Sequence, residues 1–524
     1  MLIRFRALGF PSLLTLLLLV SACDQAEPDS EPVEGGLDFV TALAVTLNPT
    51  GVAPLAAEVA VTTTQPTSVE VRIAGRGPRG IPLQHRFDDI AQTHTLPVLG
   101  LYAATENAVT LRFFDANGAV LGDTTVTVTT DRVGDAMPQI FIDVPASGGR
   151  PGLNLVSYFG HNGDVVPQRP FMFDATGATR WLLDFTDDPV LGNLFYDNGI
   201  ERLANGNLYF GSNSTSLIYE MTMLGEIVRT WDMPGFSFHH NVIEKPDGNF
   251  IATVNKVGLG TIEDHVIEID RESGAIVTVW DLNQSLDNRR RAWPSDFADL
   301  EVDWFHGNAL AYDADDDAII VSGRTQGVVK LTRDNEVVWI LAPHRGWSTS
   351  GDGTNLRRKL LQPLDAAGQP ITDGAVLDGA APHPDFEWAW YQHAPTLLPD
   401  GTLALFDNGD SRHYLPDGQG PRYSRAVLYE IDDDARTIQQ VWQYGKERGT
   451  DTFSRIVSDV DVHPEVDRVV FMPGAVIDTS TPYGKMVEVD RASGAVRFEV
   501  TIVPPQPAFG FITFHRIERL PLYP

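Results

Sequence analysis

HNVIEKPDGNFIATV (240–254) and HAPTLLPDGTLALFD (393–407) share one pattern. In each stretch an apolar run leads into a Pro-Asp-Gly turn, and a second apolar run follows. This order is typical of two antiparallel strands joined by a tight turn. Weaker copies occur elsewhere beyond residue 147, so one small β unit is used several times along the chain.

A second repeated feature is an aromatic residue in an apolar strand that follows a turn. The six positions are Trp181, Trp231, Trp280, Trp339, Trp442 and Phe498. Six four-stranded units of this kind predict an all-β fold with a six-bladed β-propeller over residues 147–524. The first unit, from residue 153, lacks an innermost strand, and the C-terminal FHRIERLPLYP (514–524) supplies one. We therefore expect the last strand to complete the first blade and close the ring.

Residues 37–146 have a different pattern. Short stretches such as EVAVTTT and AVTLRFFD alternate apolar and polar residues and are separated by turn residues. This spacing predicts an N-terminal immunoglobulin-like β-sandwich. The segment has no cluster of chemically active residues, so we expect it to act as a spacer or packing domain.

The N-terminus has the features of a bacterial lipoprotein signal. Arg4 and Arg6 precede an apolar run at 13–20, and VSAC (20–23) ends in the single cysteine, Cys23. This order predicts a signal peptide over 1–22 and lipid attachment at Cys23. The acidic segment 23–36 is expected to be a flexible tether. The folded body would then be lipid-anchored in the bacterial cell envelope, facing the periplasm or the cell surface.

The overall charge limits the choice of partners. The formal net charge is −31, which disfavours binding to nucleic acid or to anionic lipid headgroups. Membrane contact is therefore expected only through the N-terminal lipid. Nothing in the sequence fixes the oligomeric state, and a homodimer is compatible with it.

Histidines recur at one position of the repeat. The residue six places before the turn proline, or before its equivalent, is His240, His306, His393 or His515 in four units, and Asn198 or Ser458 in the other two. Innermost strands of a propeller line its central channel, so equivalent positions form a ring around the axis. The sequence predicts a ring of imidazoles at one mouth of the channel.

Imidazoles can ligate a metal, transfer protons, act as nucleophiles or donate to an anion. Arg324 follows His306 by eighteen residues, on the next expected strand. A guanidinium suits a tetrahedral oxyanion better than a metal cation, and no carboxylate shares the aligned positions. We therefore expect an anion pocket without metal or cofactor, to which Asn308 adds a donor. A zinc site remains the alternative.

Two neighbouring segments are also expected at this mouth. Tyr391, with Trp388 and Trp390, is expected either to form an aromatic wall for a substrate ring or to pack between blades. The long insert between Trp339 and His393 predicts a lid over the channel.

Several motifs resemble the bacterial arylsulfate sulfotransferase family that does not use an adenylyl-sulfate donor. They are GFSFHHNVIEKPDGNF, DWFHGNALAYD, IIVSGRTQG, WILAPHRGW, WYQHAPTLLPDGTLALFDNG and, in the N-terminal domain, LPVLGLYAATENAVTL. The resemblance covers nearly all of the chain after the signal peptide. It implies a six-bladed propeller of the envelope that moves a sulfuryl group from a phenolic sulfate ester to a phenol, in a ping-pong reaction through a sulfohistidine.

The resemblance also implies roles for individual residues. His393 matches the nucleophile, His306 and Arg324 match the groups that hold the sulfuryl oxygens, and His240 matches a further active-site histidine. His515, from the same ring, is expected to contact substrate. Two alternatives stay open: a non-catalytic ligand-binding propeller of the envelope, and a histidine-ligated metal-dependent hydrolase.

Overall fold

The computed structural model describes residues 37–77, 80–134, 137–161, 169–193, 199–291, 297, 299–416, 418–477, 482–505 and 511–523. The expected signal peptide, the tether, Cys23 and Asn198 lie outside these residues. In the described part of the chain, none of the helices has the length and apolar character needed to span a bilayer.

The N-terminal domain is one antiparallel sheet that begins at residue 40. Its strands are β1 (Val40–Leu47), β2 (Ala56–Ile73), β3 (Leu83–Leu99), β4 (Thr105–Phe114) and β5 (Val120–Thr130). They follow the order β1-β2-β4-β5, and β3 pairs with β2. Alternate residues of β2 and β4 are buried, which matches the alternation in the sequence.

Six further sheets of four or five strands, numbered here in ring order, make up the described remainder and resemble propeller blades. Sheet 1 contains β31 (Phe511–Leu520), β7 (Leu153–His161), β8 (Phe171–Phe173) and β9 (Thr179–Leu182). Sheet 2 contains β10 (Glu201–Arg202), β11 (Leu208–Ser212), β12 (Leu217–Met221) and β13 (Ile227–Asp232). Sheet 3 contains β14 (Phe236–Glu244), β15 (Phe250–Lys256), β16 (His265–Ile269) and β17 (Ile276–Asp281).

The other three sheets follow in chain order. Sheet 4 contains β18 (Gly307–Asp313), β19 (Ala318–Gly323), β20 (Gly327–Thr332) and β21 (Val337–Leu341). Sheet 5 contains β23 (His393–Leu397), β24 (Leu403–Asp407), β25 (Arg425–Asp432), β26 (Thr437–Tyr444) and β22 (Gln362–Leu364). Sheet 6 contains β27 (Asp459–His463), β28 (Arg468–Met472), β29 (Gly484–Asp490), β30 (Val496–Val503) and β6 (Gln139–Val144).

Helical segments in the described residues are all short. They are α1 (Leu282–Ser285), α2 (Gly374–Leu377), η1 (Leu191–Asn193), η2 (Leu356–Arg358), η3 (Arg412–Tyr414), η4 (Lys446–Thr452) and η5 (Pro464–Val466).

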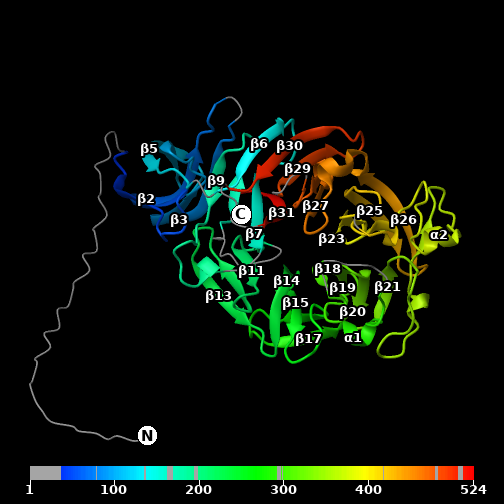
Figure 1. Ribbon diagram of the computed structural model, residues 1–524. Helices are drawn as coiled ribbons and strands as arrows, with labels where there is room; N and C mark the ends of the chain where they lie inside the picture. The colour runs from blue at the N-terminus through cyan, green and yellow to red at the C-terminus, as the bar shows by residue number, and fades with distance from the viewer. Residues whose placement is uncertain are drawn as a thin grey trace, which may run out of the picture.

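The six sheets form a closed ring (Figure 1). The first strand of each sheet, at its inner edge, is β10, β14, β18, β23, β27 or β31. A buried apolar cluster joins each sheet to the next, including sheet 6 to sheet 1. The C-terminal strand β31 pairs antiparallel with β7 from Phe511 to Leu520. The predicted closure of the first unit by the last strand is therefore confirmed.

The repeated tryptophans join neighbouring sheets. The indole N–H of Trp181 in sheet 1 donates to the Met223 carbonyl of sheet 2 at 2.8 Å. Trp231, Trp280 and Trp442 donate in the same way to a carbonyl at the turn between the third and fourth strands of the next sheet, and Trp339 donates to the Asp433 carboxylate at that turn. The repeat thus encodes one hydrogen bond at five of the six sheet interfaces, in addition to the buried ring, and Phe498 supplies only a ring at the sixth.

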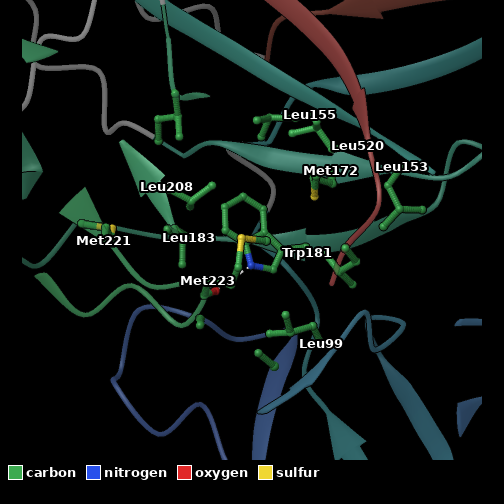
Figure 2. Close-up of a cluster of buried hydrophobic side chains, with 14 of the residues drawn as sticks. Leu99, Leu153, Leu155, Met172, Trp181, Leu183, Leu208, Met221, Met223 and Leu520 are labelled. Atoms are coloured by element: carbon green, nitrogen blue, oxygen red, sulfur yellow. Dashed lines mark hydrogen bonds between the residues drawn. The ribbon is translucent and has the colours of Figure 1, made fainter. Parts of the chain in front are cut away.

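The N-terminal domain is attached to this ring in two ways. Figure 2 shows Leu99 of β3 packed in one cluster with Trp181 and Met223, where sheets 1 and 2 meet. The strand β6 pairs with β30 at the outer edge of sheet 6. Residues 139–144 therefore belong to that sheet and not to the sandwich, to which the sequence analysis assigned them.

The insert between Trp339 and His393 does not cover the channel. Its strand β22 pairs in parallel with β26, the outermost strand of sheet 5, and α2 lies at the periphery of the molecule (Figure 1). The Nε2 atom of His344 in the insert is hydrogen-bonded to the Leu361 carbonyl at 2.9 Å. The expectation of a lid is wrong, because the insert has its own strand and extends a sheet edge.

Candidate active site

The aligned histidines lie where the innermost strands are irregular. The register of β14 against β15 shifts between Phe238 and Val242, and that of β23 against β24 shifts between His393 and Thr396. Such bulges re-aim side chains. His240 and His306 also have positive φ angles of 56° and 55°. This conformation costs a non-glycine residue on the order of 1 kcal/mol and is concentrated at functional sites.

His393 is buried, and its ring is fixed on one side. Its Nδ1 lies 2.7 Å from Asn408 Oδ1 and 3.0 Å from the Tyr391 carbonyl. Asn408 Nδ2 donates to the carbonyls of Ser454 and Val457, each at 2.9 Å, so its Oδ1 must face the imidazole. Because both neighbours of Nδ1 are acceptors, Nδ1 carries the proton and Nε2 keeps its lone pair.

The surroundings of His393 also keep it neutral. Burial is the main reason that the pKa of His393 lies well below its ordinary value, and the positive charges of Arg324, His240 and His306 lower it further. The hydrogen bond with Asn408 opposes this shift without cancelling it. At neutral pH the ring is therefore an uncharged nitrogen nucleophile.

Arg324 directly follows β19 and lies beside His306, which precedes β18 of the same sheet. Its backbone N–H donates to the His306 carbonyl at 3.0 Å, and its side chain is buried. Within the described residues it has no carboxylate partner, and its Nε has no hydrogen-bond acceptor. The Tyr391 ring centroid lies 5.8 Å from the guanidinium carbon. A buried guanidinium without a carboxylate is suited to an anionic ligand.

His240 and His306 lie together, with their Nε2 atoms 3.1 Å apart. Glu263 contacts both rings: its Oε2 is 3.2 Å from His240 Nε2 and 2.6 Å from His306 Nδ1. Asp303 Oδ2 is also 2.6 Å from His306 Nδ1. Burial would raise the pKa of Glu263, but the neighbouring histidines outweigh burial and hold it well below its usual range. Glu263 is therefore a carboxylate at neutral pH.

Three of the expected site residues have contacts that the sequence did not indicate. Asn308, expected to donate to an anion, is fully buried, and its amide donates to the Gln392 carbonyl at 3.0 Å. It therefore joins β18 to the segment that carries His393. His515 borders a small cavity beside His393, and its Nε2 is 3.1 Å from Thr513 Oγ1. Tyr391 is buried against Arg324.

The two tryptophans near Tyr391 pack between sheets 4 and 5. Trp388 donates to the Val376 carbonyl at 2.8 Å, and the Trp390 ring meets Tyr414 edge-on at 5.0 Å. Of the two interpretations of these aromatic residues, the packing one holds for both tryptophans.

Sequence reasoning missed three polar residues of the site, Glu263, Asp303 and Asn408, and it set aside His239 because only His240 keeps the repeat position. No carboxylate occupies an aligned position, yet Glu263 and Asp303 reach the histidines from loops outside the repeat. The absence of carboxylates from the aligned positions therefore does not exclude a metal ion at these histidines. The position of Asp303, three residues before His306, could have indicated a contact between them. Nothing in the sequence indicated that Glu263 contacts the histidines.

Comparison with known proteins bears directly on this site. Residues 143–506 match the arylsulfotransferase (ASST) family, and residues 44–131 match the arylsulfotransferase Ig-like domain. The chain belongs to the arylsulfotransferase family. It is 32% identical to the arylsulfate sulfotransferase AssT of Escherichia coli O6:H1, over 88% of this chain and 90% of that protein. It is 30% identical to AssT of Lelliottia amnigena over the same shares.

The family resemblance drawn from the sequence is thus confirmed, and this arylsulfotransferase is a transferase. Virginiamycin B lyase from Staphylococcus aureus aligns with a TM-score of 0.32 at 12% identity, over 77% of this chain and 95% of that one.

Proposed function

We propose that this arylsulfotransferase moves a sulfuryl group from a phenolic sulfate ester to a phenol through a sulfohistidine at His393. The observation that carries the proposal is the pairing of a buried, neutral imidazole, with its Nε2 lone pair available, and a buried arginine without a carboxylate partner among the described residues. A nucleophile and an anion-binding group are the two components that transfer of a sulfuryl group requires.

The first half-reaction needs an aligned nucleophile and charge stabilisation. His393 Nε2 attacks sulfur, the N–S bond forms, the S–O bond to the phenol breaks, and the phenolate leaves with the bonding electrons. As in phosphoryl transfer, charge on the equatorial oxygens must be stabilised. Arg324, with His306 beside it, supplies that stabilisation, and Asn408 Oδ1 accepts the hydrogen bond of His393 Nδ1–H as positive charge develops on the ring.

The second half-reaction reverses the first with another phenol. The acceptor loses its proton to a base, its oxygen attacks sulfur, the N–S bond breaks, and His393 is regenerated. The His240–His306 pair, held by Glu263 and Asp303, is the base we assign. The same pair can protonate a poor leaving group in the first step. Neither half-reaction uses an external cofactor.

The wider proposal concerns the whole chain. We interpret the six sheets as a six-bladed propeller whose axial channel opens at the site. The body would be held in the cell envelope by lipid on Cys23, as the residues before it indicate. Incorporation of labelled palmitate into the full chain, and its loss in Cys23→Ser, tests the anchor.

The activity itself is tested with nitrophenyl sulfate. We expect the full-length protein to release nitrophenol at a rate that rises with added phenol, with phenyl sulfate as the second product. Added chelator should not abolish the reaction. Release that is independent of every phenol tested, with inorganic sulfate as the product, would instead indicate a hydrolase. The absence of release with all donors would favour a binding propeller.

A pH experiment tests the state of His393. Because its pKa is lowered, the burst of nitrophenol in the first half-reaction should stay level as pH falls from about 8 to about 6. Asn408→Asp places a carboxylate at Nδ1 and favours the imidazolium. In this variant we expect the burst rate to begin falling at a pH that is higher by about one unit or more than in the wild type.

Asn408→Ala is the matched control for this experiment, since it removes the hydrogen bond without adding charge. It should slow the burst at every pH, and the pH at which the burst rate begins to fall should stay as low as in the wild type. A burst rate that begins to fall at the same pH in wild type and Asn408→Asp would contradict the assignment of His393 as the titrating nucleophile.

A further inference from the structure

Three imidazoles surround one carboxylate beside the proposed nucleophile. Glu263 Oε1 lies 2.8 Å from His239 Nε2, and Glu263 Oε2 contacts His240 Nε2 and His306 Nδ1. The ligand atoms of His239, His240 and Glu263 lie within 4.8 Å of one another, as do those of Glu263, Asp303 and His306. These five residues, called here the Glu263 cluster, come from the bulge in the middle of β14, the loop before β16 and the loop before β18.

The Glu263 cluster contains more acceptors than its protons can satisfy. Asp303 Oδ2 and Glu263 Oε2 both lie 2.6 Å from His306 Nδ1, which has at most one hydrogen to donate. Asp303 is 7% exposed, and its Oδ1 has no hydrogen-bond partner among the described residues. Two buried carboxylates at one N–H leave negative charge that a cation would compensate.

The orientation of His306 favours a metal as that cation. With its Nδ1–H donated to a carboxylate, its Nε2 lone pair points toward His240 Nε2, 3.1 Å away. Carboxylate–histidine pairs of this kind hold the imidazole ligands of metal sites. Tetrahedral zinc with Zn–N bonds of about 2.0–2.1 Å separates its ligand atoms by about 3.3 Å. Three neighbouring pairs are 2.8–3.2 Å apart: His239 Nε2–Glu263 Oε1, His240 Nε2–Glu263 Oε2 and His240 Nε2–His306 Nε2. Small outward shifts would bring these pairs to that spacing.

Glu263 is held in place for such a role. It has a positive φ of 59°, its backbone N–H donates to Asn255 Oδ1 at 2.7 Å, and its carbonyl accepts from Gly307 N–H at 2.8 Å. A strained backbone that is fixed on both sides pre-organises the carboxylate. Imidazole donors select zinc and similar transition metals over calcium and magnesium, which prefer oxygen ligands.

We propose that His239, His240, Glu263 and the Nε2 atom of His306 form a binding site for a divalent transition metal of the zinc class, with Asp303 as the outer partner of His306. The metal would use the two histidines that we assign to the acid–base step. Metal and sulfate ester therefore exclude each other, and zinc acts as an inhibitor. The metal-binding part stands without the proposed function, and only the inhibition rests on it.

Binding is tested by equilibrium dialysis of the chelator-treated full-length protein against Zn²⁺, with metal quantified in the retained protein. We expect one zinc per chain, and a loss of affinity of about tenfold or more in Glu263→Gln and in His239→Gln. His383→Gln, a change of the same type on the distant insert, is the matched control and should bind like wild type. Circular dichroism of each variant shows whether it is folded.

Cobalt gives a second readout of the geometry. Co²⁺ at a tetrahedral site absorbs visible light strongly, and this absorption should be present in wild type and absent in Glu263→Gln. Equal zinc affinity in wild type, Glu263→Gln and His239→Gln would overturn the proposal, as would failure of the wild type to retain zinc. If transfer activity is found, zinc should lower it, and less so in His239→Gln. If no activity is found, dialysis and cobalt absorption still decide the metal site.

Discussion

Replacing His393 by alanine should lower sulfuryl transfer by about 10⁴-fold or more, because loss of the covalent nucleophile leaves only binding and electrostatic stabilisation. The change removes a buried ring that Asn408 holds in one orientation. Nitrophenol release from nitrophenyl sulfate, with phenol as acceptor, measures the effect.

His515→Ala is the matched control for this variant. His515 occupies the equivalent position of the repeat and borders the same small cavity, but its Nε2 is engaged by Thr513. We expect it to change the rate by no more than about tenfold, as a residue outside the covalent chemistry. Intact-mass measurement after mixing wild type with donor alone should show one added sulfuryl group, on the peptide that contains His393. A His393→Ala protein with substantial activity would place the nucleophile elsewhere.

Removal of residues 511–524 should prevent the chain from folding to a stable monomeric body. This deletion takes out β31, the strand that completes sheet 1, and with it Ile512, Phe514 and Ile517, which are buried between sheets 6 and 1. The exposed edge of β7 would then be available for pairing with other chains. Urea unfolding followed by circular dichroism, and size-exclusion chromatography, measure the outcome.

A single substitution gives a graded form of the same test. Phe514 is fully buried, so Phe514→Ala should lower the free energy of unfolding by about 3–5 kcal/mol. Ile227→Ala on the outer strand β13 is the control, because Ile227 is 44% exposed and its loss should cost about 0.5 kcal/mol or less. A truncated chain that unfolds at the same urea concentration as the full chain would show that ring closure contributes nothing to stability.

The two proposals concern one set of side chains. His240 and His306 contact Glu263, and their positive charges lower the pKa of His393. A zinc ion bound by the Glu263 cluster would add further positive charge beside Arg324 and occupy the groups needed for proton transfer. Added zinc should therefore slow sulfuryl transfer, and removal of zinc should not. A metallohydrolase would behave in the opposite way, because it needs its metal for activity.

The sequence by itself determined the β repeat, the closure of sheet 1 by the last strand and the shared position of four histidines. Strand alternation, turn residues and the spacing of tryptophans are local properties, so they can be counted along the chain. The tertiary structure alone decided that Glu263, Asp303 and Asn408 contact those histidines and that the insert lies at a sheet edge. Glu263, Asp303 and the insert lie in segments without a repeat phase, whereas Asn408 directly follows β24. All three side chains meet the histidines only because the sheets pack into a ring.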